Sequence, residues 1–126
     1  MSEPEPGSIV MSEPFDLFII MPVYEDWVAL GGLLQQIDRE SALQGLSVGV
    51  LVVNDALSEP ASLPFDTGQL RLIHQIEVIN LARNLGHQRA ITTGLSYLYH
   101  HYRATHVVVM DADGEDRPAD IGWLLE

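Results

Sequence analysis

Short apolar segments that suit β-strands alternate with amphipathic segments that suit α-helices along most of this chain of 126 residues. The first apolar segment, Phe15 to Met21, is stopped by Pro22, and the next is Leu46 to Val53. Between them lie apolar residues at helical spacing, namely Val28, Leu30, Leu33, Leu34 and Ile37. We expect this helix to be capped by Asp26 and to end near Glu40.

The same alternation continues through the second half of the chain. Strands are expected over Ile76 to Leu81 and Val107 to Met110, and Pro118 is expected to open a last helix. A helix is expected over residues 87 to 102, with one apolar face formed by Ile91, Leu95, Leu98, Tyr99 and Tyr102. Because parallel strands need crossover connections, this order predicts an α/β fold, a mostly parallel sheet with helices on both faces.

The length suits one domain, which we place at residues 15–126. Residues 1–14 carry the tetrapeptide MSEP twice and are expected to form a disordered leader. The leader lacks the basic start of a signal peptide, and the apolar runs are far shorter than the roughly 20 residues that span a bilayer. These features predict a cytoplasmic protein.

Charge and cysteine content exclude several function classes. Eighteen acidic residues against six Lys and Arg give a formal net charge of −12, which repels nucleic acid and favours cations or a polyanionic ligand that arrives with a metal. The absence of cysteine excludes disulfide scaffolds, thiolate metal sites and thiol nucleophiles.

Distinctive polar residues follow three of the expected strands: Pro22 to Asp26, Asn54 with Asp55, and Asp111 with Asp113. In parallel sheets ligands bind outside the carboxyl ends of the strands, so we expect these residues to converge on one rim. There Tyr24 could stack on a base or pack at the sheet edge, and Asp55 could accept hydrogen bonds from a base or begin a turn.

The segment Met110 to Asp116 (MDADGED) carries four acidic side chains within six positions at the end of an expected strand. Such carboxylates repel one another unless a cation lies between them, and their oxygens suit Mg²⁺ or Mn²⁺. The alternative is a solvated acidic turn ahead of Pro118.

A cluster of hydrogen-bond donors precedes and opens the helix at residue 87: Arg83, Asn84, Gly86, His87, Gln88 and Arg89. Helix amino ends attract anions, Gly86 permits close approach of the backbone, and together with Arg71 this stretch holds three of the six basic residues. The cluster favours diphosphate contact over a simple helix cap. The sequence has no P-loop, no G-x-G-x-x-G and no nucleophile elbow, which argues against kinase, dehydrogenase and hydrolase functions.

Four motifs occur in an order that resembles the family 2 glycosyltransferases, and most closely their polyprenyl-phosphate sugar transferases, the dolichol-phosphate mannosyltransferase and bactoprenol glucosyltransferase group. They are PVYED at 22–26, VVND at 52–55, LARNLGHQRAITTGL at 81–95 and MDADGEDRPADI at 110–121. The resemblance implies a GT-A fold and inverting transfer of a sugar from a nucleotide-diphosphate donor to a polyprenyl phosphate, as in cell-envelope glycan synthesis.

The resemblance also implies roles for individual residues. Pro22, Tyr24 and Asp26 would line the base and ribose pocket, and Asp55 would bond the base. The D-x-D motif, Asp111, Ala112 and Asp113, would hold the diphosphate through Mg²⁺ or Mn²⁺, with Glu115 as a further metal contact. Asn54 stands where the family has an aspartate and Glu115 where it often has Gln, which leaves the metal preference open.

Members of this family continue well beyond the D-x-D motif into an acceptor-binding half, whereas this chain stops at Glu126. We therefore expect a donor-binding half that lacks transferase activity by itself, and we assign no catalytic residue. In the longer enzyme the acceptor would be a polyprenyl phosphate or a glycan, reached at the cytoplasmic membrane surface. The alternatives are a family 2 transferase acting on a sugar hydroxyl, a non-catalytic nucleotide-binding module, and an interaction module that docks or forms a homo-oligomer through a sheet edge.

Overall fold

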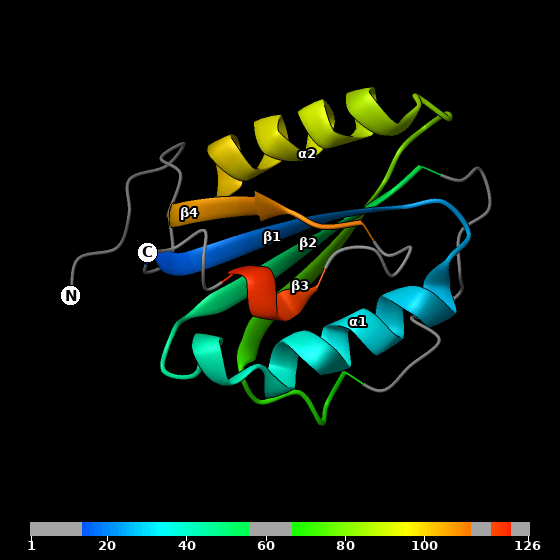
Figure 1. The fold of residues 1–126 in the computed structure, drawn as a ribbon. Coiled ribbons are helices and arrows are strands. Elements are labelled where there is room, and N and C mark those ends of the chain that lie inside the picture. Colours follow the sequence, from blue (N-terminus) through cyan, green and yellow to red (C-terminus); the bar gives the residue numbers. More distant parts are fainter. Residues whose placement is uncertain (1–13, 56–66, 112–116, 122–126) are drawn as a thin grey trace.

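The computed structural model describes residues 14–55, 67–111 and 117–121. Strands and helices follow in the expected order (Figure 1). They are β1 (Phe15–Val23), α1 (Trp27–Arg39), the 3-10 turn η1 (Ser41–Leu43), β2 (Val48–Asn54), β3 (Ile73–Asn80), α2 (His87–His101), β4 (Ala104–Val109) and the 3-10 turn η2 (Pro118–Asp120). The expected leader lies outside the described residues except for Pro14.

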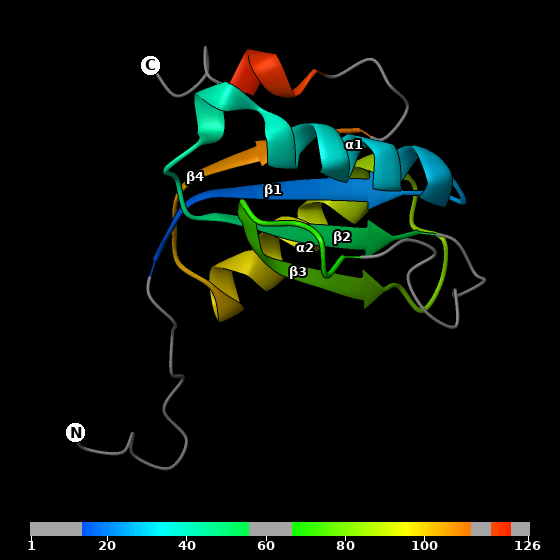
Figure 2. The ribbon, with the colours of Figure 1, turned by 90° about the horizontal axis from the view of Figure 1, so that it is seen from below.

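The four strands form one parallel sheet in the order β3-β2-β1-β4. Val23 is paired with Asn54, and Asn54 with Asn80, so β1, β2 and β3 end level with one another. Their arrowheads point to the same side in Figure 2. The parallel sheet that the alternation predicts is confirmed.

The helices cover opposite faces of the sheet, with α2 on one side and α1 on the other (Figure 1). Leu17, Ile19 and Met21 pack into the buried cluster on the α1 side, whereas Phe18 and Ile20 pack into the cluster on the α2 side. Strands covered on both faces read as continuous apolar runs, which explains the sequences of β1 and β2. The prediction of helices on both faces is confirmed.

Boundaries of all four strands differ from the prediction. β2 spans Val48–Asn54 instead of Leu46 to Val53, and β3 and β4 each end one residue early, at Asn80 and Val109. β3 begins at Ile73 instead of Ile76, and β4 begins at Ala104 instead of Val107, because backbone pairing with a neighbour extends both strands beyond their apolar residues. β1 continues through Pro22 to Val23.

The structure gives a reason why a proline fits within β1. The carbonyl of Ile20 accepts a hydrogen bond from Met110 N on the β4 side, and the carbonyl of Val23 accepts one from Asp55 N on the β2 side. Since alternate residues of a strand direct their backbone groups to opposite neighbours, Pro22 faces the β4 side, where pairing has already ended at Ile20 and Val109. No ladder hydrogen bond is lost there.

The predicted apolar face of α2 is partly wrong. Leu98 is buried as expected, but Leu95 and Tyr99 are 43% and 81% exposed, and the helix contacts the sheet through Ala90 and Gly94 as well. Because Ala90 and Gly94 are small, the helix axis lies close to β1 and β2. The helix face that carries Ala90 and Gly94 is turned toward the sheet, and Leu95 and Tyr99 therefore point away from it.

The prediction for α1 holds for Leu30, Leu33, Leu34 and Ile37, whereas Val28 is 89% exposed. Asp26 is the residue at the N-cap position, but its side chain makes no capping hydrogen bond. The prediction of a side-chain cap is therefore wrong. Its backbone, at φ −93° and ψ 49°, lies outside the extended region that capping requires.

The helix expected from Pro118 begins as the turn η2, and Ile121 packs into the cluster on the α1 side. Among the described residues no helix combines the length and the apolar character needed to cross a membrane.

Candidate functional site

A pocket of about 530 Å³ opens at the carboxyl ends of the strands. Ten residues line it: Pro22, Val23, Tyr24, Asp26, Asp55, Asn84, Gly86, His87, Ala90 and Asp111. They come from the ends of β1, β2 and β4 and from the start of α2. The chain proceeds from β1 through β2 to β3 on one side and then returns to β4 on the other, which makes this edge the switch point of the sheet. The predicted convergence of separate strand ends on one rim is confirmed.

The loop between β1 and α1 supplies one wall of the pocket. Tyr24 is 54% exposed there, so its ring is accessible to a planar ligand. The neighbouring Glu25 has φ 66°, the only positive φ of a non-glycine residue in the described part of the chain. This left-handed residue turns the chain sharply between the strand and the helix and so sets the direction of Tyr24 and Asp26.

Asp55 lies at the base of the pocket and is only 6% exposed. Its Oδ1 accepts a hydrogen bond from Leu85 N at 2.7 Å, and its Oδ2 accepts one from Gly86 N at 3.0 Å. Its own N–H donates to the carbonyl of Val23 at 2.9 Å. One residue therefore joins the ends of β1 and β2 to the loop before α2.

Gly86 is the residue immediately before α2, with φ 85° and ψ 160°. Side-chain-bearing residues almost never adopt this backbone conformation, which explains the glycine better than the close approach that the sequence suggests. Its N–H also lies 2.9 Å from Asn84 Oδ1, so two side chains accept from one amide.

His87 and Asp111 face each other across the pocket, with His87 Nε2 at 3.2 Å from Asp111 Oδ1. The pair joins the first residue of α2 to the end of β4, and it forms a charged pair when the imidazole is protonated. His87 belongs to the donor cluster of the sequence but is not among the predicted site residues. Its place directly after Gly86, at the first position of α2, is the sequence signal that would have identified it as a pocket residue.

Two basic residues of the expected diphosphate contact do not line the pocket. Arg83 is exposed and does not line the pocket. Arg71 precedes β3 and lines a different pocket at the amino ends of the strands. A strand of eight residues separates it from the pocket edge, and at about 3.3 Å per residue this is too far for a shared ligand. The contribution expected from Arg71 is wrong.

Of the expected D-x-D segment, Asp111 lies at the pocket, whereas Ala112, Asp113 and Glu115 lie outside the described residues. Within the described ranges no three His, Cys, Asp or Glu side chains gather as metal ligands. The carboxylate of Asp111 is a hard oxygen donor of the kind that Mg²⁺ and Mn²⁺ prefer.

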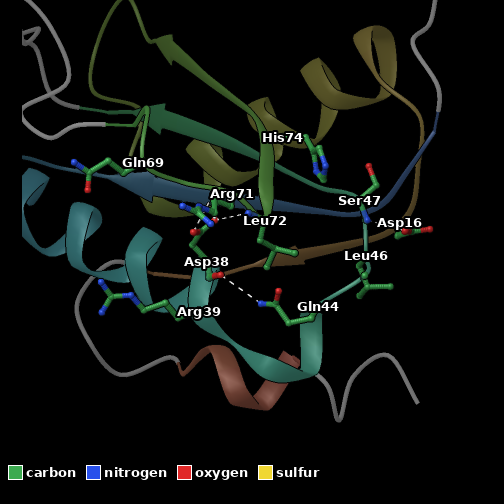
Figure 3. Close-up of a pocket in the computed structure, with 11 residues that line it drawn as sticks. Asp16, Asp38, Arg39, Gln44, Leu46, Ser47, Gln69, Arg71, Leu72 and His74 are labelled. Atoms are coloured by element: carbon green, nitrogen blue, oxygen red, sulfur yellow. Dashed lines mark hydrogen bonds between the residues drawn. The ribbon is translucent and has the colours of Figure 1, made fainter.

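The second pocket, about 700 Å³, lies at the opposite end of the sheet (Figure 3). Asp38 is its most constrained residue, because its carboxylate accepts hydrogen bonds from the backbone N–H groups of Arg71, Leu72 and Ile73 at 2.7 to 3.2 Å. Gln44 Nε2 donates to the Asp38 carbonyl at 3.4 Å. These bonds fasten α1 to the start of β3. Because ligands of parallel sheets bind at the carboxyl ends of the strands, the smaller pocket at that edge is the better candidate site.

Comparisons with known proteins identify the family of the chain. A model of glycosyl transferase family 2 matches residues 18–126, which hold all ten lining residues. YkcC, an uncharacterized glycosyltransferase of Bacillus subtilis (strain 168), is 28% identical over 116 residues, covering 92% of this chain and 34% of the relative.

Further relatives are named undecaprenyl-phosphate 4-deoxy-4-formamido-L-arabinose transferase. The protein from Enterobacter sp. (strain 638) is 31% identical over 108 residues, covering 85% of this chain and 32% of the relative. The protein from Klebsiella pneumoniae (strain 342) is 28% identical over 109 residues, covering 86% and 32%. The chain thus spans only 32% to 34% of the length of these relatives. Since the family model covers most of the chain, including its parallel sheet and the pocket at the strand ends, the chain belongs to glycosyl transferase family 2.

Proposed function

We propose that the pocket at the strand ends binds a nucleotide-diphosphate sugar, and that the chain is the donor-binding part of a transferase acting on a polyprenyl phosphate. The observation that carries this proposal is the meeting of four motifs, separated by up to 89 positions between Pro22 and Asp111, in one pocket of about 530 Å³. This volume lies within the roughly 300–1,000 Å³ of ordinary ligand pockets.

The two sides of the pocket suit different parts of such a donor. The exposed ring of Tyr24 offers a stacking surface for the base, with Pro22 and Asp26 beside it. Asn84, Gly86 and His87 lie at the amino end of α2, where a helix dipole favours an anion such as the diphosphate. Arg83 lies just before them in the loop, exposed and outside the pocket lining, and we propose it as a further contact of the diphosphate.

Asp111, together with Asp113 and Glu115, would hold Mg²⁺ or Mn²⁺ beside the diphosphate. When bound, such a cation stabilises the negative charge that develops as the nucleotide diphosphate leaves. Asp111 lies two residues after the end of β4, and it lines the pocket.

The acceptor is proposed from the relatives whose names specify transfer to undecaprenyl phosphate. A phosphate monoester is already largely ionised near neutral pH, because its second pKa is about 6, so its oxygen needs no strong general base to attack the sugar carbon. Displacement by this attack would invert the configuration at that carbon. The full enzyme would meet this lipid acceptor at the cytoplasmic membrane surface.

Isothermal calorimetry with UDP, GDP and TDP, each with and without Mn²⁺, tests the donor site. We expect binding that requires the metal, and we expect Asp111→Asn to weaken it at least about tenfold, because the neutral amide is a poorer metal ligand. Asp120→Asn is the matched control, since Asp120 is paired with Arg117 outside the pocket. Metal-dependent binding that survives unchanged in Asp111→Asn would contradict the proposal, as would the failure of all three nucleotides to bind.

A further inference from the structure

Asp55 is a buried carboxylate whose two oxygens both accept hydrogen bonds from consecutive backbone N–H groups thirty residues further along the chain. The bonds from Leu85 N and Gly86 N measure 2.7 and 3.0 Å, and the side chain is only 6% exposed. Carboxylate acceptors make stronger hydrogen bonds than neutral ones. The primary partners of this carboxylate are therefore within the protein.

These bonds fix the segment Asn84 to His87, which forms the side of the pocket where we propose that the diphosphate binds. Gly86 has no side chain to hold it in place, and the next residue, His87, faces Asp111 across the pocket. Without the two bonds, a glycine at this position would be free to take other conformations, and the start of α2 would move with it. Asp55 thus controls the position of Asn84, Gly86 and His87.

We infer that Asp55 is a positioning residue, which holds the segment Asn84 to His87 in place for the diphosphate of the donor, rather than a residue that selects the base. This inference rests on the proposed function, because it assigns the segment to the phosphate side of the same ligand. It differs from the base contact that the family resemblance implies for Asp55, and the two roles make different predictions.

Asn is the informative replacement for Asp55, because its amide keeps the shape but can accept only one of the two N–H groups. Its NH₂ would then face the other N–H, donor against donor. Asp38→Asn is the matched control. Asp38 makes the same kind of bonds, to Arg71, Leu72 and Ile73, but at the opposite end of the sheet. A loss of overall stability should affect both variants, whereas a loss of pocket geometry should affect Asp55→Asn alone.

The experiment measures binding of UDP and of inorganic pyrophosphate, each with Mg²⁺, to the wild-type chain and to both variants. Pyrophosphate has no base, so a base-selecting residue cannot influence its affinity. We expect Asp55→Asn to weaken both ligands by a similar factor, about tenfold, and Asp38→Asn to weaken neither. A loss for UDP with unchanged pyrophosphate binding would overturn the inference and restore the base contact.

Backbone amide resonances give a second readout that needs no ligand. In the wild type, the amide protons of Leu85 and Gly86 should be shifted downfield by the carboxylate and slow to exchange. Asp55→Asn should abolish both properties and shift His87 as well, whereas Asp38→Asn should affect residues 71–73 only. If no ligand binds to the wild type, the proposed function fails, and these resonances still decide whether Asp55 holds the segment. Unchanged Leu85 and Gly86 amides in Asp55→Asn would overturn the inference.

Discussion

Two tyrosine hydroxyls, of Tyr97 and Tyr102, donate hydrogen bonds to the carboxylate of Glu77 on β3. For Tyr102, burial is the main cause that raises the pKa above the usual 10.0, and the bond to Glu77 and its negative charge add to it. For Tyr97 the bond to Glu77 is the main cause of a raised pKa, followed by burial. The cluster lies on the α2 side of the sheet, where Tyr102 also packs on Phe18.

The raised pKa values predict how stability depends on alkaline pH. A hydroxyl whose pKa is higher in the folded than in the unfolded chain stabilises the fold fully below the unfolded value of 10.0, and this contribution is lost as the pH rises through the folded value. We expect the ultraviolet titration of tyrosinate to show two groups that ionise above the ordinary pKa of 10.0.

Glu77→Gln should lower both pKa values toward 10.0 and reduce stability by about 1–3 kcal/mol, since a charged acceptor of two hydrogen bonds is lost. Glu40→Gln is a suitable control, because Glu40 accepts a local backbone bond from Ala42 and contacts neither tyrosine. An unchanged tyrosine titration in Glu77→Gln would show that the charge of Glu77 does not raise the pKa values of Tyr97 and Tyr102.

At the scale of an element, the position of α2 depends on one small residue. A Cβ atom at Gly94 would lie 2.9 Å from Val53 Cγ2 and 3.2 Å from Ile20 Cγ2, and both of those side chains are fully buried. These distances are shorter than ordinary contacts. The glycine therefore sets how closely α2 approaches the sheet.

Gly94→Ala should destabilise the protein by about 1 kcal/mol, because overpacking exceeds the gain in helix propensity. Gly32→Ala in α1 is the matched comparison, because nothing lies within 4 Å of a Cβ at that position. It should stabilise by about 0.5–1 kcal/mol. Urea denaturation measures the free energy of unfolding of both variants. Equal changes of the same sign in the two variants would show that contact with Val53 does not determine the effect of the Cβ atom at residue 94.

Gly94 also shows what the sequence could and could not predict about the elements. Periodicity places a helix correctly over residues 87 to 102, but it weights large apolar residues, so it assigns Leu95 and Tyr99 to the buried face instead of Ala90 and Gly94. The start of β3 at Ile73 escapes prediction because it depends on pairing with Val48, a residue distant in sequence.

The meeting of the strand ends is predicted better than these boundaries, because parallel topology alone brings those ends together. Tyr24, Asp55 and Asp111 therefore line one pocket as expected. The pairing of Asp55 with two backbone N–H groups could not be predicted, since it depends on how the loop before α2 folds back.

At the scale of the whole molecule, the formal net charge of −12 on 126 residues predicts a clear salt effect. Repulsion among like charges destabilises the compact state, and salt screens it, with a Debye length that falls from about 30 Å at 0.01 M to about 10 Å at 0.1 M. The melting temperature should therefore rise between these two NaCl concentrations. Scanning calorimetry measures it, and a melting temperature that falls with added salt would mean that attractive ion pairs outweigh the repulsion.

Pro22 has a further consequence at the edge of the sheet that holds the candidate site. Its ring nitrogen faces the β4 side just past the last paired residues, Ile20 and Val109, and it has no hydrogen to offer. Pro22 therefore cannot donate the next hydrogen bond of the β1–β4 ladder. The paired part of β1 and β4 therefore ends before Pro22, so the pocket that Pro22 lines lies beyond the last hydrogen bonds of this ladder.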